Sequence, residues 1–135
     1  MKHIEVVAAI ILWNGKILCM QRNAGKYHYV SYKYEFPGGK IEPGESNIEA
    51  LTRELREEMD IEVEISDKDY FLTVHHDYPD FSITMHSYLC RVSNNCFTRK
   101  EHAAHQWLDK SELHTLDWAS ADIPIVKKLE GSVLA

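Results

Sequence analysis

Cysteine is scarce in this 135-residue sequence: only Cys19, Cys90 and Cys96 occur, and no two of them have CxxC spacing. An odd number of widely separated cysteines argues against a disulfide scaffold and is typical of a reducing compartment. We therefore expect three free thiols, each buried as a small apolar side chain, in a cytoplasmic protein.

Long apolar runs are also missing, since no segment approaches the ~20 apolar residues that a membrane-spanning helix requires. Residues 6–13 follow Lys2 as the apolar part of a signal peptide would. However, Glu5 borders them, and Asn14-Gly15-Lys16 stands where a small-residue cleavage site would be needed. The sequence has no internal repeat and no Gly/Ser/Pro-rich linker, so we expect a single soluble domain over residues 1–135.

Positive charge is in deficit, with a formal net charge of −6 and a pI near 5.7. Proteins that bind nucleic-acid polymers usually carry a basic face, so such a partner is not expected. Hydrophobic residues make up 44% and charged residues 27%, which is ordinary for a globular protein. A small anionic substrate remains compatible with this charge if a cation bridges it to the protein.

The hydrophobic pattern predicts strands and helices in mixed order. Residues 6–12 form a continuous apolar run that indicates a strand buried on both faces, and Asn14-Gly15 favours a tight hairpin turn. Ser46 and Glu49 have the spacing of a helix capping box. Expected strands cover residues 6–12, 17–21, 70–75, 82–92 and 105–108, expected helices cover 47–59 and 123–130, and 23–34 is a loop. The predicted class is α/β or α+β, with helices packed on a mixed sheet.

The helix expected over residues 47–59 carries two stripes, because successive helical residues are rotated by about 100°. The apolar stripe is Ile48, Leu51, Leu55 and Met59, and the acidic one is Glu54, Glu57 and Glu58. Acids at this spacing repel by a few tenths of a kcal/mol per pair, and the helix dipole disfavours them in the last turns by roughly 0.3–1 kcal/mol each. A hard divalent cation with oxygen ligands would remove both penalties. A metal site is therefore favoured over a merely charged helix face.

A glycine pair precedes this helix. Gly38 and Gly39 allow the backbone to approach a ligand closely. The pair alone is weak evidence of function, but its position directly before an acid-rich helix strengthens the hypothesis of a metal and phosphate site.

These residues resemble the Nudix box, whose pattern is G-x5-E-x7-R-E-U-x-E-E-x-G-U, where U is aliphatic. The matching positions are Gly39, Glu45, Arg53, Glu54, Leu55, Glu57, Glu58 and Ile61. Asp60 replaces the second glycine of the pattern; because Asp tolerates a left-handed conformation, we expect a modest cost in stability and intact chemistry. Residues 35–42 and 121–124 further resemble MutT-type enzymes and related CTP pyrophosphohydrolases. The resemblance implies an α/β/α sandwich around a mixed sheet.

The resemblance also implies roles for individual residues. Mg²⁺, or Mn²⁺ in its place, would be bound by the Gly39 carbonyl with Glu54, Glu57 and Glu58. Arg53 would orient Glu54, and Glu45 would brace the loop through an ion pair. Glu101 stands where MutT-type enzymes place a further acid on a loop, as a metal ligand or as the general base; its alternative is an ordinary surface glutamate. The catalytic residues would thus be Arg53, with Glu54 or Glu101 as the base.

The implied reaction cleaves a nucleoside triphosphate to a monophosphate and pyrophosphate, by substitution at phosphorus. Arg22, Gly38 and Lys40 are candidate phosphate contacts. Asp122 stands where MutT-type enzymes carry an amide that reads 8-oxoguanine, although it could instead cap the closing helix. An acid can also accept from the cytosine amino group. We expect an 8-oxo-dGTP-type substrate and nucleotide-pool sanitation, with CTP, dCTP or 5-methyl-dCTP as the alternative. Phe36, Phe81 and Trp118 either stack on the base or belong to the core.

Other interpretations remain. A Nudix-like module could sense a nucleotide without hydrolysing it, but such a module would be expected to have lost box acids. His75-His76 or His102-x-x-His105 could bind Zn²⁺, although exposed histidines are the simpler expectation without a cysteine partner. A nucleotide-sugar or ADP-ribose hydrolase is a further possibility within the family. The oligomeric state is open.

Overall fold

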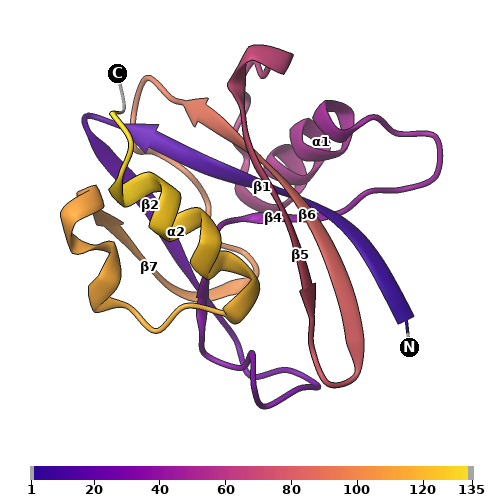
Figure 1. The fold of residues 1–135 in the computed structure, drawn as a ribbon. Helices are drawn as coiled ribbons and strands as arrows, with labels where there is room; N and C mark the ends of the chain where they lie inside the picture. Colours follow the sequence, from indigo (N-terminus) through magenta and orange to yellow (C-terminus); the bar gives the residue numbers. More distant parts are fainter. Residues whose placement is uncertain (1, 134–135) are drawn as a thin grey trace.

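The computed structural model describes residues 2–133, which form one mixed sheet covered by helices (Figure 1). The strands run in the order β3-β2-β1-β6-β5, with β4 on β1 and β7 on β2. β1 and β6 are parallel along their shared length, and the other pairs are antiparallel. The strands are β1 (Lys2–Trp13), β2 (Lys16–Arg22), β3 (Tyr34–Glu35), β4 (Gly38–Lys40), β5 (Tyr70–Asp77), β6 (Phe81–Arg91) and β7 (His102–Leu108).

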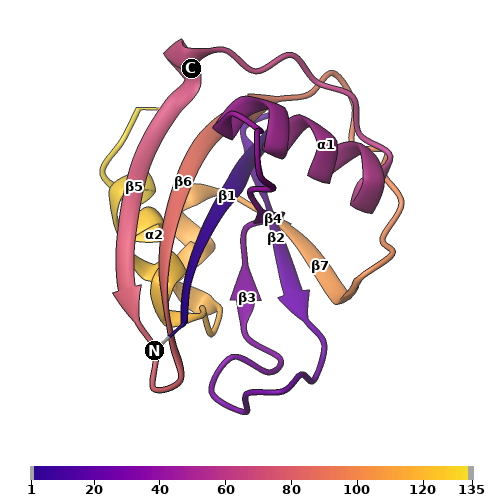
Figure 2. The ribbon, with the colours of Figure 1, turned by 90° about the vertical axis from the view of Figure 1, so that its right-hand side faces the viewer.

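Two α-helices lie on opposite faces of this sheet (Figure 2), which confirms the expected α/β/α sandwich. They are α1 (Asn47–Met59) and α2 (Ile123–Glu130), both with the bounds predicted from the sequence. Three short 3₁₀ helices complete the described elements: η1 (Asp67–Asp69), η2 (Lys110–Thr115) and η3 (Ser120–Asp122). Within residues 2–133, no helix has both the length and the apolar character to cross a membrane.

The central strand β1 explains the two-layered core. Side chains alternate across a strand, so Val7 and Ile11 pack under α1 while Ile10 and Leu12 pack on the side of α2. Residues 7–12 are all buried, as the continuous apolar run predicts. Because both faces of β1 are covered, its position is strongly specified, and it supports the loop and helix that carry the acids.

Local turn chemistry places both ends of α1 as expected. At the N-cap, the Ser46 side chain accepts from Glu49 N–H and the Glu49 side chain accepts from Ser46 N–H. At the other end, Asp60 is left-handed, with φ 54° and ψ 33°. Its carboxylate accepts from Lys100 at 3.0 Å, while Lys100 also donates to the Glu57 carbonyl at 3.1 Å. The end of α1 is thereby tied to the segment that leads into β7.

Several expectations about elements were incomplete or wrong. Four of the five predicted strands are longer in the structure, β6 has the predicted length but begins and ends one residue earlier, and β7 begins three residues earlier than predicted. β3 and β4 were missed because two or three residues carry no readable periodicity; pairing with β2 and β1 creates them. Cys19 and Cys90 are buried, but Cys96 is exposed, which contradicts the expectation of three buried thiols. It lies in an irregular segment between β6 and β7, outside the sheet that buries the other two.

Candidate active site

Two adjoining cavities lie beside α1, β2 and β4. The larger, of about 460 Å³, is lined by Phe36, Tyr78, Phe81 and Asp122 among others. The smaller, of about 300 Å³, includes Glu58, Glu101 and His102. Arg22, Glu35 and Gly38 line both cavities, so a ligand with an aromatic end and a charged end could extend across this shared wall.

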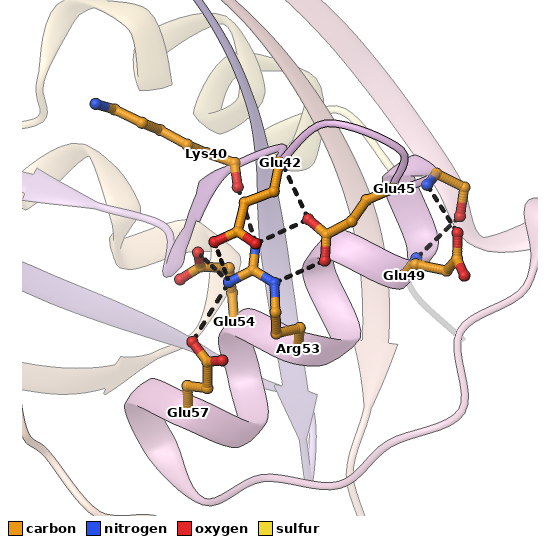
Figure 3. A network of polar contacts seen from close by, with 8 residues as sticks. Lys40, Glu42, Glu45, Glu49, Arg53, Glu54 and Glu57 are labelled. Carbon is orange, nitrogen blue, oxygen red and sulfur yellow. Dashed lines mark hydrogen bonds and ion pairs between the residues drawn. The ribbon is translucent and has the colours of Figure 1, made fainter.

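Arg53 is the centre of a polar network between α1 and the loop before it (Figure 3). Its guanidinium donates to both carboxylate oxygens of Glu45, at 2.7 and 2.9 Å, and to Glu54 Oε1 at 2.9 Å. It also donates to the Lys40 carbonyl at 3.1 Å, whereas the Lys40 side chain extends away from the network. The Arg53 hydrogen bonds hold the pKa of Glu45 below its usual range. Arg53 therefore stays charged and joins the loop to the helix.

Gly39 brings the backbone of β4 against the Glu54 carboxylate. A Cβ built at Gly39 would lie 2.5 Å from the Glu54 carboxyl carbon and 2.6–2.7 Å from its oxygens. Gly39 pairs with Val7 on β1, whose side chain belongs to the core under α1. A side chain at position 39 would displace the Glu54 carboxylate, so the glycine lets the backbone of β4 lie directly against that carboxylate.

Several carboxylates face Glu58 from separate parts of the chain. Burial, a hydrogen bond that protonated Glu58 donates to Glu54, and the charges of Glu54, Glu101 and Glu35 raise the pKa of Glu58 to about 9. Carboxylates crowded in this way are poorly stabilised as anions by the protein alone. Oxygen donors carrying excess negative charge are the ligand set that Mg²⁺ and similar hard cations prefer, so the chemistry of these donors, though not their present arrangement, fits such an ion.

Glu57 occupies a different position from its two neighbours on α1. Its carboxylate contacts Arg53 at 3.4 Å, and 62% of the side chain is exposed. Throughout residues 2–133, no three His, Cys, Asp or Glu side chains are arranged so that they could hold a metal ion. In this conformation Glu54, Glu57 and Glu58 do not form such a group, and neither do the histidines of the two alternative zinc sites. His75 instead contacts Thr84, and His102 contacts Glu35.

The far end of the larger cavity is aromatic, with one buried acid. Phe81 lies between Tyr27 and Tyr78, with ring centroids 5.2 and 5.0 Å away. Asp122 is buried, and its Oδ1 accepts from the Phe36 amide at 3.1 Å. Burial raises the pKa of Asp122 well above its usual range, with a smaller contribution from the nearby Glu35 charge. Asp122 occupies the N-cap position of α2, as the capping alternative expected, but its side chain makes no hydrogen bond to the first turn of the helix.

Two of the aromatic residues considered at the cavity belong mainly to the core. Phe36 and Trp118 stack on each other with centroids 4.8 Å apart, and both are buried. Trp118 also donates to the Leu113 carbonyl at 2.7 Å. Phe36 reaches the cavity wall, so it is both a core residue and part of the site.

Residues 2–129 match the family model of the NUDIX domain. The chain belongs to the Nudix family. It is 39% identical to the CTP pyrophosphohydrolase of Escherichia coli K12, over 94% of this chain and 91% of that protein. It is also 31% identical to the 8-oxo-dGTP diphosphatase of the same organism, over 96% and 98% of the two chains.

Solved structures of Nudix relatives have the same fold. The solution structure of the E. coli ORF135 protein matches with a TM-score of 0.81 and 37% identity, covering 97% of this chain and 91% of that one. The MutT structure from methicillin-resistant Staphylococcus aureus 252 matches with a TM-score of 0.76 and 39% identity, covering 97% and 98%.

The structure of this Nudix protein adds three residues that the sequence interpretation did not select. Glu35 and Tyr78 line the larger cavity, and Glu35 also lines the smaller one together with His102. The expectation of exposed histidines is wrong for His102, whose side chain is only 8% exposed. Glu35 directly precedes the Phe36-Pro37-Gly38-Gly39 segment, and that neighbourhood was the one signal that could have identified it.

Proposed function

We propose that this protein is a Mg²⁺-dependent nucleoside triphosphate pyrophosphohydrolase that releases a nucleoside monophosphate and pyrophosphate. The observation that carries the proposal is the group of carboxylates around Glu58, placed beside Arg22 where the two cavities meet. The two E. coli relatives, whose names describe hydrolysis of nucleoside triphosphates, support the same reaction class.

The box acids supply the ligands for the ion in this proposal. Glu54, Glu57, Glu58 and the Gly39 carbonyl would hold it, with Glu101 as a further ligand from the start of β7. Glu57 now pairs with Arg53, but exposed pairs at this helical spacing contribute only about 0.3–0.5 kcal/mol. Turning Glu57 toward the cavity therefore costs little. When bound, Mg²⁺ supplies positive charge between the carboxylates and the phosphates and lowers the pKa of a bound water.

The chain's own residues perform the remaining tasks. Arg22 and Lys40 would contact the phosphates from the shared cavity wall and its rim, with Gly38 allowing close approach. Arg53 holds Glu54 by a charged hydrogen bond. A carboxylate, Glu54 or Glu101, would accept the proton of the attacking water while the bond from phosphorus to the leaving oxygen breaks.

The base would occupy the larger cavity between the aromatic wall and Asp122. An 8-oxo-dGTP-type substrate and a role in nucleotide-pool sanitation are the first candidate, supported by the likeness to 8-oxo-dGTP diphosphatase over nearly the whole chain. A cytosine nucleotide is the second candidate. It is favoured by the buried acid at position 122, since a carboxylate oxygen can accept from the cytosine amino group.

The deciding experiment measures pyrophosphate release with Mg²⁺ for 8-oxo-dGTP, dGTP, CTP, dCTP and 5-methyl-dCTP, giving kcat/KM for each. Glu57→Gln and Glu58→Gln are expected to lower kcat by at least about 100-fold, because each removes a metal ligand. Glu62→Gln is the matched control, an acid whose side chain is 82% exposed just beyond α1. Full turnover in both box variants would overturn the metal assignment. Nucleotide binding without pyrophosphate release in the wild type would indicate a sensing module instead.

A further inference from the structure

His102 occupies an unusual place for a histidine. It is the first residue of β7, and its side chain is almost fully buried beside the smaller cavity. In the sheet it pairs with Arg22 on β2, directly after the irregularity in register between Gln21 and Arg22. Arg22 is the last residue of β2 and His102 is the first residue of β7, so both lie at the end of the paired region, where they line the smaller cavity.

A chain of two hydrogen bonds runs from His102 to Arg22 across this strand end. His102 Nε2 donates to Glu35 Oε2 at 2.9 Å, and Glu35 Oε1 accepts from Arg22 Nη1 at 2.9 Å. Both Glu35 oxygens are thus occupied, one by each neighbour. The Glu35 carboxylate is held by hydrogen bonds at both oxygens, so the planar Arg22 guanidinium bonded to it has little freedom to rotate.

Arg22 also has a donor left over. Its Nε is buried, and within residues 2–133 it has no hydrogen-bond partner. The guanidinium lies at the wall shared by both cavities, between the aromatic end and the acidic end. Its orientation therefore decides whether its donors meet the phosphate chain of a ligand that spans the two cavities.

The same strand end also holds the residue before His102. Asn23 Nδ2 donates to the Glu101 carbonyl at 2.7 Å, and the Glu101 charge acts on Glu58. The chain that enters β7 is consequently attached to the chain that leaves β2 at two adjacent residues, Glu101 and His102. The attachment at His102 leads through Glu35 to Arg22, and the attachment at Glu101 holds the residue whose charge acts on Glu58.

We propose that His102 is a positioning residue that acts through Glu35 to hold the Arg22 guanidinium toward the triphosphate. This inference rests on the proposed pyrophosphohydrolase function. Glu35 lies near other acids, including Glu58 and Asp122. Without the His102 donor, one Glu35 oxygen loses its partner, the carboxylate is free to turn, and Arg22 turns with it.

The test compares His102→Leu, which removes the donor, with His102→Gln, which keeps an N–H donor on a side chain of similar reach. The exposed His114→Leu in η2 is the control. With the best nucleotide of the panel, His102→Leu is expected to lower kcat/KM about 10- to 100-fold, the usual effect of removing such a supporting contact. His102→Gln should restore most of this loss, and His114→Leu should match the wild type. All assays are run well below the measured Tm of each variant.

A double-mutant cycle separates positioning from general structural support. In an Arg22→Ala background, His102→Leu should lower kcat/KM by less than about twofold, because the residue through which it acts is gone. The same 10- to 100-fold loss in that background would overturn the proposal, as would equal losses for His102→Leu and His102→Gln. If His102→Leu does not fold, His102→Asn replaces it, since that side chain is too short to reach Glu35.

A binding measurement keeps this inference distinguishable from the proposed function. Calorimetry of pyrophosphate with Mg²⁺ is expected to show about 10-fold weaker binding to His102→Leu than to the wild type. Absence of nucleotide turnover in the wild type would refute the pyrophosphohydrolase, whereas equal pyrophosphate affinity of the two proteins would refute the role of His102.

Discussion

Gly39 lies so close to Glu54 that a Cβ at position 39 would meet the Glu54 carboxylate at 2.5–2.7 Å. Its neighbour Gly38 is crowded more closely, and by backbone, since a Cβ there would lie 1.9 Å from the Val7 carbonyl oxygen. A flexible side chain can move away, whereas a backbone carbonyl in the central strand cannot. The two glycines are therefore required for different reasons.

This difference predicts opposite outcomes for two matched substitutions. Gly38→Ala should lower the free energy of unfolding by about 1–3 kcal/mol or more, because β1 and β4 must separate. Gly39→Ala should cost less stability but lower kcat strongly, because it displaces Glu54 from its place beside Arg53. Thermal denaturation and pyrophosphate release distinguish them. Full activity in Gly39→Ala would contradict the assignment of this contact to the site.

Arg53→Lys tests whether the guanidinium network holds the loop and Glu54 together. Lysine cannot donate to both oxygens of Glu45 while also reaching Glu54. We expect a loss of about 1–3 kcal/mol in stability, since charged hydrogen bonds are removed, together with a lower kcat. Arg56→Lys is the control, because the Arg56 side chain is 61% exposed and its guanidinium lies 3.8 Å from the Glu62 carboxylate. Equal behaviour of the two variants would show that the network has no special role.

Glu58→Gln predicts a pH-dependent gain in stability. The folded pKa of Glu58, about 9, lies above its ordinary value of 4.5. Between these values the folded state holds a proton that the unfolded state releases, so stability falls as pH rises through that window. Without metal, Glu58→Gln should therefore be more stable than the wild type at pH 8. The advantage should shrink as pH falls toward 5.

The measurement is Tm in EDTA from pH 5 to pH 9 for the wild type, Glu58→Gln and Glu57→Gln. Glu57 is exposed and paired with Arg53, so its variant should lack the pH-dependent gain. Adding Mg²⁺ should raise the Tm of the wild type more than that of Glu58→Gln, because an ion that binds only the folded state stabilises it. A constant difference between Glu58→Gln and the wild type across the pH range would contradict the raised pKa.

Asp122→Asn tests whether the Asp122 side chain selects the base of the nucleotide substrate. Asparagine keeps the oxygen that accepts from the Phe36 amide, and it adds an N–H donor that ionised aspartate lacks. The ratio of kcat/KM for 8-oxo-dGTP to that for CTP should rise by about 10-fold, within the range that one base contact contributes. Asp80→Asn, which changes an exposed acid bonded to Tyr29, should leave the ratio unchanged. An unchanged ratio in Asp122→Asn would remove Asp122 from base selection.

Elements with local determinants were predicted well from the sequence. The capping box at Ser46 and the helical spacing of the apolar residues placed α1 at its observed bounds, because both signals lie within a few residues of each other. The left-handed Asp60 followed from its position just past the helix. The short strands β3 and β4 could not be predicted, since they exist only through pairing with β2 and β1.

The contacts of the candidate site also divide into those between residues near in sequence and those that only the folded sheet brings together. The contacts of Arg53 with Glu45 and Glu54 span eight residues or fewer, and the resemblance of this segment to the Nudix box implied them. The link between Glu35 and His102 joins residues 67 positions apart. It depends on the register of β7 on β2, including its irregularity, and no local pattern encodes that register.

By itself, the sequence determined the acid-rich helix, its caps, the glycine loop and the family, because these depend on residue type at short, regular spacing. Only the tertiary structure decided which distant side chains complete the site. At the N-cap of α2, the buried Asp122 side chain bonds to the Phe36 amide and not to the helix, and strand pairing brought His102 to Glu35 and Arg22. The physical reason is that the free energy of a buried hydrogen bond or charge depends on neighbours that meet only when the sheet forms.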